Sequence, residues 1–205
     1  MALQTNLQNP MTVLGTHQGI IFDLDGTLVD SRLDFSLLCQ RLGWPAGTPI
    51  LEHLATLNDP AEVAVAAQII EQFELEGAAT ACWMPGAAAL LQHLQQQKIP
   101  TAILTRNIKS ATELCIKNLQ INVDLVLTRE DCTPKPDPAG LLHIAGTWQL
   151  DCRQLLFVGD YLFDLQTAAR AGMPSCLYRT ADNAHFAELA DFIIDDFSEL
   201  QQHYR

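Results

Sequence analysis

The length and charge of the chain exclude several classes of protein. It has 205 residues, enough for one domain with an insertion or for two small domains. It carries 24 acidic residues against 12 lysines and arginines and has no basic cluster, so we expect no nucleic-acid partner. No apolar run approaches the roughly 18 residues of a membrane-spanning helix, so we expect no membrane association. The six cysteines form no CxxC pair, which indicates reduced thiols in a cytoplasmic protein.

The N-terminal part of the chain predicts an extension followed by a buried strand. Residues 1–18 have neither the basic start nor the apolar segment of a signal peptide, and we expect a loose extension. Residues 19–24 begin with Gly-Ile-Ile-Phe, an apolar run typical of a central strand that helices cover on both faces. This strand ends in Asp23-Leu-Asp-Gly-Thr.

Residues 33–82 show no strand signal and instead have apolar residues at helical spacing. The breaks fall at residues 43–45 and 58–60, where Asp59 is a candidate helix cap and Pro60 a candidate first helical residue. We predict a small helical insertion, with Trp83 at its exit as a candidate lining residue of a cleft. The three apolar stripes are Leu33, Leu37, Leu38 and Leu42; Ile50, Leu51, Leu54 and Leu57; and Val63, Ala66, Ala67, Ile70 and Phe73.

The rest of the chain alternates strand-like and helical segments. Further strands are predicted at 100–105, 123–127, 155–159, 175–178 and 192–194, and helical periodicity fills most of the intervals. This alternation indicates an α/β fold with a parallel sheet and helices on both faces. We therefore expect one core domain made of residues 19–32 and 83–205, with the helical insertion 33–82 mounted on it.

Polar residues follow four of the predicted strands. In a parallel α/β sheet, ligands bind beyond the carboxyl ends of the strands, so these residues are expected to converge on one edge. Several carboxylates brought together in a partly desolvated cleft need a compensating cation, and Mg²⁺ prefers such oxygen ligands. The candidate residues are Asp23 and Asp25 after the first strand, Thr105, Arg106 and Asn107 after the second, Lys135 after the third, and Asp160 with Asp164 after the fourth.

These segments resemble the four motifs of the haloacid dehalogenase (HAD) superfamily. The resemblance rests on Asp23-Leu-Asp-Gly-Thr, Thr105, Lys135 and Gly159-Asp160 with Asp164, in that order and at strand ends. The helical insertion and the sequence Pro-Gly-Ala at residues 85–87 are similar to the phosphoglycolate-phosphatase-like branch. The resemblance implies a Rossmann-like core with a helical cap, and a Mg²⁺-dependent phosphatase acting on a small phosphomonoester.

The resemblance also implies a role for each catalytic candidate. Asp23 would attack phosphorus and form an aspartyl phosphate. Asp25 would protonate the leaving alkoxide and then activate the water that hydrolyses the intermediate. Thr105 would hold phosphoryl oxygens, and Lys135 would neutralise the nucleophile and the charge that develops on the phosphoryl group.

The metal and the leaving group would be bound by further residues of these segments. Asp23, Asp160 and the backbone carbonyl of Asp25 would bind Mg²⁺, with Asp164 orienting Lys135 or metal-bound water. Arg106 stands where the family often has Asn directly after the motif threonine, so the substrate contacts are expected to differ there. We take Arg106 and Asn107, together with Arg41, as candidate contacts to the leaving group. The expected partner is therefore a small-molecule phosphate ester. We expect the protein itself to be a monomer or a weak homodimer.

Other functions stay open at this point. A phosphosugar mutase, or another phosphotransferase of the superfamily, uses the same aspartate pair, although the short insertion disfavours the exclusion of water that a mutase needs. From a different class, a receiver-like signalling protein or a non-catalytic phosphate-binding protein also gathers aspartates on a parallel sheet. The lifetime of phosphorylated Asp23 separates these alternatives, because a catalyst turns it over quickly.

Overall fold

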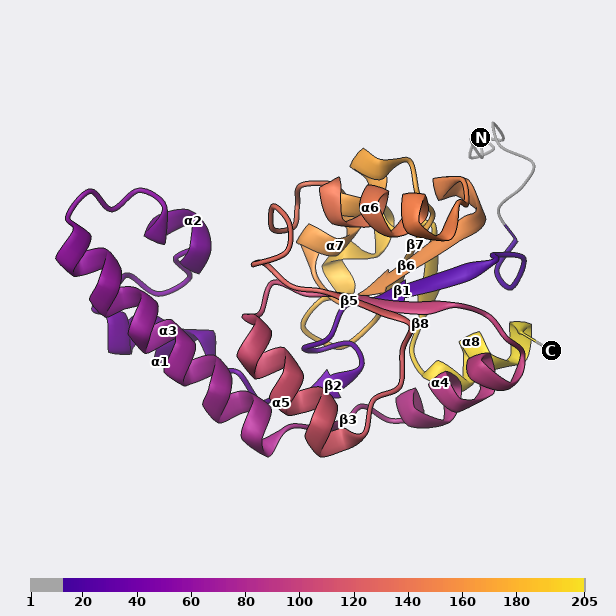
Figure 1. Ribbon diagram of the computed structural model, residues 1–205, viewed down its shortest axis with the longest axis horizontal. Helices are drawn as coiled ribbons and strands as arrows, with labels where there is room; N and C mark the ends of the chain where they lie inside the picture. Colours follow the sequence, from indigo (N-terminus) through magenta and orange to yellow (C-terminus); the bar gives the residue numbers. More distant parts are fainter. Residues whose placement is uncertain (1–12, 205) are drawn as a thin grey trace, which may run out of the picture.

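The computed structural model describes residues 13–204 and contains a six-stranded parallel sheet (Figure 1). The strand order is β5-β4-β1-β6-β7-β8, which places the first strand in the middle. All six predicted strands are confirmed, some shorter by one or two residues at their ends. Their bounds are β1 (Gly19–Phe22), β4 (Thr101–Leu104), β5 (Leu125–Leu127), β6 (Leu155–Gly159), β7 (Ser175–Tyr178) and β8 (Phe192–Ile194).

Helices cover both faces of this sheet, as the apolar strands predicted (Figure 1). One face carries α4 (Ala87–Gln96), α5 (Lys109–Leu119) and α8 (Phe197–His203), and the other carries α6 (Ala139–Trp148) and α7 (Leu162–Ala171). Alternate residues of β1 serve the two layers, because Ile20 and Phe22 pack into the first core and Ile21 into the second. Short 3₁₀ helices lie at Cys152–Gln154 and Ala184–Leu189. The fold is α/β and Rossmann-like.

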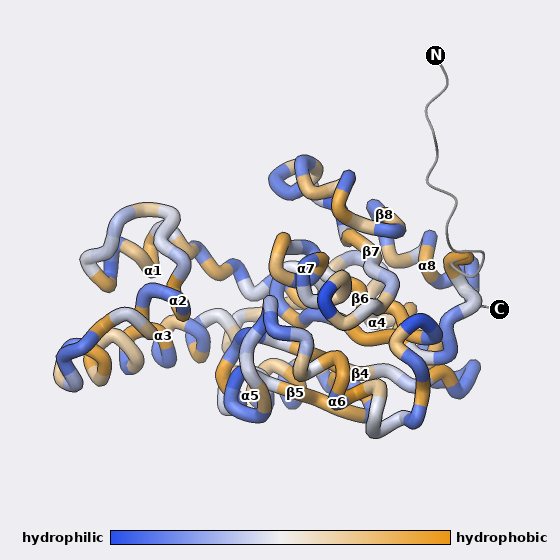
Figure 2. The backbone as a smooth tube through the Cα atoms, turned by 90° about the horizontal axis from the view of Figure 1, so that it is seen from above, coloured by the Kyte–Doolittle hydropathy of each residue, from blue (hydrophilic) through white to orange (hydrophobic). Residues whose placement is uncertain are grey.

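The helical insertion forms a separate group of helices beside the sheet. It contains α1 (Phe35–Leu42), α2 (Ile50–Leu54) and α3 (Pro60–Thr80), which lie to the left of the core in Figures 1 and 2. A small core of Leu38, Ile70 and Phe73 holds α1 and α3 together. The predicted start of α3 is confirmed, because Pro60 is its first residue and the Asp59 side chain accepts a hydrogen bond from Ala61.

One element of this region differs from the sequence prediction. Two strands that the sequence did not predict, β2 (Val29–Asp30) and β3 (Cys82–Trp83), pair antiparallel where the chain enters and leaves the insertion. Strands of two residues are too short to show an alternating pattern, so no local signal predicts them. This pairing holds the two chain segments that connect the insertion to the core side by side.

The predicted N-terminal extension 1–18 falls mostly outside the described residues. Its last part contacts the core, because the Gln18 N–H donates to the Gln154 carbonyl at 2.7 Å and the His17 ring is buried beside Phe192. Within residues 13–204, none of the helices combines the length and the hydrophobicity needed to cross a bilayer. The six cysteines are all free, and Cys82 among them is exposed.

Candidate active site

The candidate site lies where the strand order reverses. The chain places β4 and β5 on one side of β1 and then returns to place β6 on the other side, so the carboxyl end of β1 opens onto a crevice. Phe22 is in register with Ile103 of β4 and Val158 of β6, which sets Asp23 level with the ends of both neighbours. A cavity of about 500 Å³ opens there, between the sheet and the insertion. The eight candidates predicted to follow the strand ends all line it.

Lys135 lies at the floor of this cavity between two carboxylates. Its Nζ is 2.7 Å from Oδ1 of Asp23 and 2.6 Å from Oδ1 of Asp164, and only 2% of the lysine side chain is exposed. The Leu24 N–H also donates to Oδ1 of Asp23, at 2.7 Å. Burial alone would lower the pKa of Lys135, but Asp164 and Asp23 outweigh it and raise this pKa. The lysine is therefore a fixed cation.

Three carboxylates crowd around this single ammonium group. Oxygen atoms of Asp23, Asp160 and Asp164 all lie within 4.8 Å of one another. Burial raises the pKa of Asp23 well above its usual value, and burial followed by the charge of Asp164 raises the pKa of Asp160 to about 7. Three hard oxygen donors with a surplus of negative charge fit a Mg²⁺ ion, which needs one or two carboxylates and keeps positions for other ligands.

Asp25 faces a different partner. Its carboxylate is outside the three-carboxylate group, and its Oδ2 accepts a hydrogen bond of 3.0 Å from Nδ2 of Asn107. Burial raises the pKa of Asp25, opposed mainly by hydrogen bonds from Ser31 and Asn107. A carboxyl group with a raised pKa holds its proton more readily, which suits a general acid. Asn107, predicted to bind substrate, thus orients Asp25 in this structure.

Two glycines allow the loops of the site to approach closely. Gly26 has φ of +80°, and a Cβ atom there would lie 2.6 Å from Oδ2 of Asp160. A Cβ on Gly159 would lie 2.4 Å from Cβ of Asp164. The Thr27 hydroxyl donates to Oδ1 of Asp160 at 3.0 Å. These contacts hold the ends of β1 and β6 against each other.

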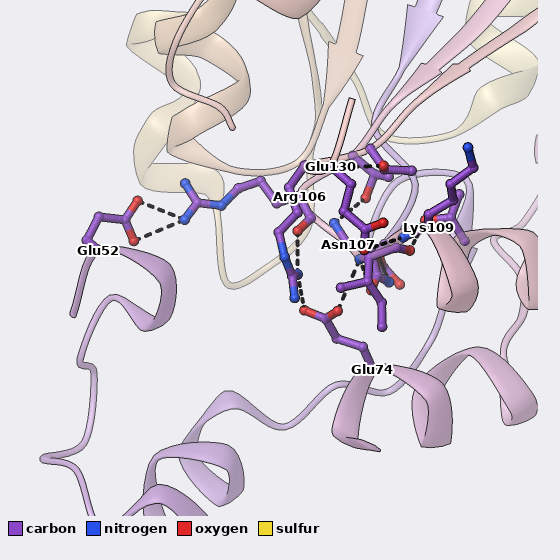
Figure 3. Close-up of polar contacts among 12 residues, drawn as sticks. Glu52, Glu74, Arg106, Asn107, Lys109 and Glu130 are labelled. Atoms are coloured by element: carbon purple, nitrogen blue, oxygen red, sulfur yellow. Dashed lines mark hydrogen bonds and ion pairs between the residues drawn. The ribbon is translucent and has the colours of Figure 1, made fainter. Parts of the chain in front are cut away.

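Arg106 lines the cavity, but its guanidinium group is already engaged (Figure 3). Nη2 lies 2.7 and 3.0 Å from the carboxylate oxygens of Glu52 on α2, and Nη1 donates to the Lys135 carbonyl. The guanidinium carbon lies 4.4 Å from the centre of the Phe163 ring. The sequence predicted Arg106 as a contact to the substrate, whereas the structure shows its charge paired with the insertion. Thr105 is buried, and its Oγ1 accepts from the Asn107 N–H at 3.1 Å.

Two other sequence expectations are wrong. Arg41 does not line the cavity, because its Nη1 pairs with Glu76 within the insertion at 2.8 Å. Trp83 does not line it either and pairs with Val29 in the short β2–β3 ladder. The Arg41 side chain is held by its ion pair with Glu76, and the Trp83 backbone is held by its strand pairing with Val29. Both contacts lie away from the cavity.

The structure adds a second contact between insertion and core that sequence reasoning missed (Figure 3). Oε2 of Glu74, on α3, accepts from the Ile108 N–H at 3.1 Å, and its Oε1 pairs with Arg129. Arg129 also donates to the Arg106 carbonyl at 2.8 Å. Burial raises the pKa of Glu74, with Arg129 opposing it. No motif marks these residues, because the pair joins positions 55 residues apart.

We expect Glu74→Ala to lower the free energy of unfolding by about 3 kcal/mol, because it leaves the largely buried Arg129 guanidinium without its carboxylate partner, whereas the Ile108 N–H keeps Oδ1 of Asn107 as an acceptor. Urea denaturation at pH 7 measures the change. Glu76→Ala is the matched control, since Glu76 lies on the same helix in an exposed ion pair, and its loss is expected to change the free energy of unfolding much less. Equal losses for the two variants would contradict the prediction.

Comparisons with known proteins agree with this geometry. Residues 40–178 match the family model described as haloacid dehalogenase-like hydrolase. A haloacid dehalogenase-like hydrolase domain-containing protein of Arabidopsis thaliana is 30% identical, over 90% of this chain and 82% of its own length. A phosphoglycolate phosphatase of Pseudomonas putida is 31% identical, over 88% of this chain and 77% of its own length.

A solved structure shows the same fold. A hydrolase of the haloacid dehalogenase-like family from Streptococcus pneumoniae superposes with a TM-score of 0.72 at 24% identity, covering 94% of this chain and 100% of that one. The family model matches well over half of the chain, and its range includes Thr105, Lys135, Asp160 and Asp164. The chain therefore belongs to the haloacid dehalogenase-like hydrolases, a family of enzymes with phosphatases among its relatives here.

Proposed function

We propose that this hydrolase is a magnesium-dependent phosphatase that cleaves a small phosphomonoester through an aspartyl phosphate on Asp23. The observation that carries the proposal is the placement of Asp23 in the cavity, paired with Lys135 and with its carboxylate oxygen within 4.8 Å of oxygens of Asp160 and Asp164. The Pseudomonas putida relative, named phosphoglycolate phosphatase, supports the reaction class. In this proposal residues 33–82 act as the cap over the site and residues 19–32 and 83–205 as the core.

The first half of the reaction is the transfer of the phosphoryl group to Asp23. Hydrogen bonds from Leu24 and Lys135 to Oδ1 fix the orientation of this carboxylate. Bound Mg²⁺, held by Asp23, Asp160 and the Asp25 carbonyl, would keep Asp23 ionised and neutralise charge on the phosphoryl oxygens. The Thr105 hydroxyl and the Lys135 ammonium would bind the same oxygens, and Asp164 holds Lys135 in place.

Asp25 acts in both halves of the reaction. In the first half it gives a proton to the oxygen of the leaving alcohol as the phosphorus–oxygen bond breaks, and burial raises the pKa of Asp25, which favours the protonated form. The resulting carboxylate, held by Asn107, then takes a proton from the water that attacks the aspartyl phosphate. Asp25 ends in its starting state, and Asp23 is regenerated.

Removal of the metal tests the first part of the proposal. We expect phosphate release from a panel of phosphomonoesters with Mg²⁺, and a decrease of about 10³-fold or more with EDTA, because charge neutralisation by a metal contributes several kcal/mol. Restoring Mg²⁺ should restore the rate. A rate that does not change with EDTA would contradict the metal dependence. Isomerised ester in place of free phosphate would identify a mutase.

The lifetime of the phosphorylated protein tests the second part. Asp25→Asn retains a side chain for Asn107 but lacks the base, so with p-nitrophenyl phosphate, whose leaving group departs without protonation, we expect phosphorylated Asp23 to accumulate, visible as one added phosphoryl mass on the intact protein. The unmodified chain should lose the same mass within a turnover. A phosphoryl group that persists for minutes on the unmodified chain would favour a receiver-like protein over an enzyme.

A further inference from the structure

We infer that the ester cleaved here carries an uncharged leaving group with an apolar face, and that Glu52 sets this preference against carboxylate-bearing substrates. The inference rests on the proposed phosphatase function and specifies its substrate class. It is carried by the charges and the apolar side chains of the cavity wall beyond Asp23 and Lys135.

The cavity offers no uncommitted cation to a second anionic group. Among the described residues that line it, the cationic side chains are Lys135 and Arg106. Lys135 is held between Asp23 and Asp164, and Arg106 is paired with both carboxylate oxygens of Glu52. A carboxylate on the leaving group would have to displace Glu52 from Arg106 or lie beside it as a like charge, and both are unfavourable.

Exposed aromatic side chains from both the insertion and the core also line the cavity. Phe35, on α1 of the insertion, is 57% exposed, and Tyr161, after β6, is 51% exposed, although both line the cavity. Tyr161 packs edge-on against Phe163, whose face carries the Arg106 guanidinium. A leaving group with an apolar face would cover this exposed aromatic surface and gain the free energy of its burial.

The size of the cavity fits such a group. A volume of about 500 Å³ lies within the range of about 300–1,000 Å³ for sites that enclose drug-sized ligands. A two-carbon leaving group would leave the wall formed by Phe35, Ile50 and Leu51 uncovered. The volume therefore favours a leaving group large enough to reach from Asp25 to the insertion.

A matched pair of esters tests the preference. Benzyl phosphate and 4-carboxybenzyl phosphate differ by one remote carboxylate, and the methylene group keeps their leaving-group chemistry similar. With Mg²⁺ we expect kcat/KM to be at least about tenfold higher for benzyl phosphate, a ratio equivalent to about 1.4 kcal/mol. Phosphoglycolate and 2-hydroxyethyl phosphate form a second pair, and we again expect the higher kcat/KM for the ester without a carboxylate, 2-hydroxyethyl phosphate.

Glu52→Gln tests the residue that sets the preference. The substitution keeps the volume and removes the negative charge, so Arg106 is free to pair with a substrate carboxylate. We expect the ratio of kcat/KM for 4-carboxybenzyl phosphate to kcat/KM for benzyl phosphate to rise about tenfold. Glu76→Gln is the control, because it loses an equivalent ion pair to an arginine of the insertion outside the cavity. It should leave the ratio unchanged.

Phe35→Ala tests the apolar wall. We expect KM for benzyl phosphate to rise about tenfold and KM for methyl phosphate to change little, because methyl phosphate is too small to cover Phe35. Val65→Ala is the control, since Val65 is a similarly exposed apolar residue of the insertion that does not line the cavity.

Three outcomes would overturn the inference. The first is a preference of the unmodified chain for the carboxylate-bearing ester in both pairs. The second is an equal change in kcat/KM for both benzyl esters in Glu52→Gln. That result would show that Glu52 only joins the insertion to the core through its ion pair with Arg106. The third is the absence of turnover on every ester, p-nitrophenyl phosphate included, which would overturn the proposed phosphatase function and this inference with it.

Discussion

Replacing Asp23 by asparagine is expected to lower kcat/KM by about 10⁴-fold or more for every phosphomonoester, because the amide cannot form the aspartyl phosphate. The loss should be the same for neutral and anionic esters, since Asp23 contacts the phosphoryl group that all of them share. Steady-state phosphate release measures it. Intact mass must show that the introduced asparagine has not deamidated back to aspartate during purification.

The stability of this variant separates a chemical role from a structural one. Burial raises the pKa of Asp23 in the folded state, so the ionised carboxylate at neutral pH costs stability in the absence of metal. Asp23→Asn removes that cost, and we expect its free energy of unfolding in EDTA to equal or exceed that of the unmodified chain. Asp124→Asn is the control, because Asp124 accepts from the Thr101 N–H at the opposite end of the strands and should retain activity. Retained activity in Asp23→Asn would refute the nucleophile assignment.

Replacing Lys135 by methionine is expected to affect both activity and stability. The substitution keeps an unbranched buried chain but removes the positive charge between Asp23 and Asp164, whose Oδ1 atoms lie 2.7 and 2.6 Å from Nζ. We expect the free energy of unfolding in EDTA to fall by about 3–5 kcal/mol, the usual cost of breaking a buried ion pair. The rate should fall about 10²- to 10³-fold, as when one donor to a developing oxyanion is lost.

Added Mg²⁺ distinguishes this electrostatic effect from a packing defect. A cation bound to the remaining carboxylates compensates for the lost ammonium group, so Mg²⁺ should restore more stability to Lys135→Met than it adds to the unmodified chain. Urea denaturation with EDTA and with Mg²⁺ gives both differences. Lys117→Met, at an exposed position of α5, should change neither stability nor rate. A loss of stability that Mg²⁺ leaves unchanged would show that Lys135 acts through packing.

Local sequence determined the fold class and the residues of the candidate site. Apolar runs such as Ile20 to Phe22 are buried on both faces, so their composition alone predicts central strands and helices on either side. Each polar candidate comes directly after such a run, or in the loop or first helical turn that follows it, and parallel strands bring these ends to one edge. For this reason Asp23, Lys135, Asp160 and Asp164 could be predicted to meet, and they line one cavity.

Only the tertiary structure decided which partner each of these residues has. The charge of Arg106 is visible in the sequence, but its pairing with Glu52 depends on how the insertion packs on the core, as does the pairing of Glu74 with Arg129. These contacts join residues more than 50 positions apart, and no local pattern encodes such a distance. The pKa of Asp25 is likewise set by its burial and its neighbours. Residue type and the succession of strands and helices along the chain are local properties, whereas charge pairing and desolvation arise only when separate segments come into contact.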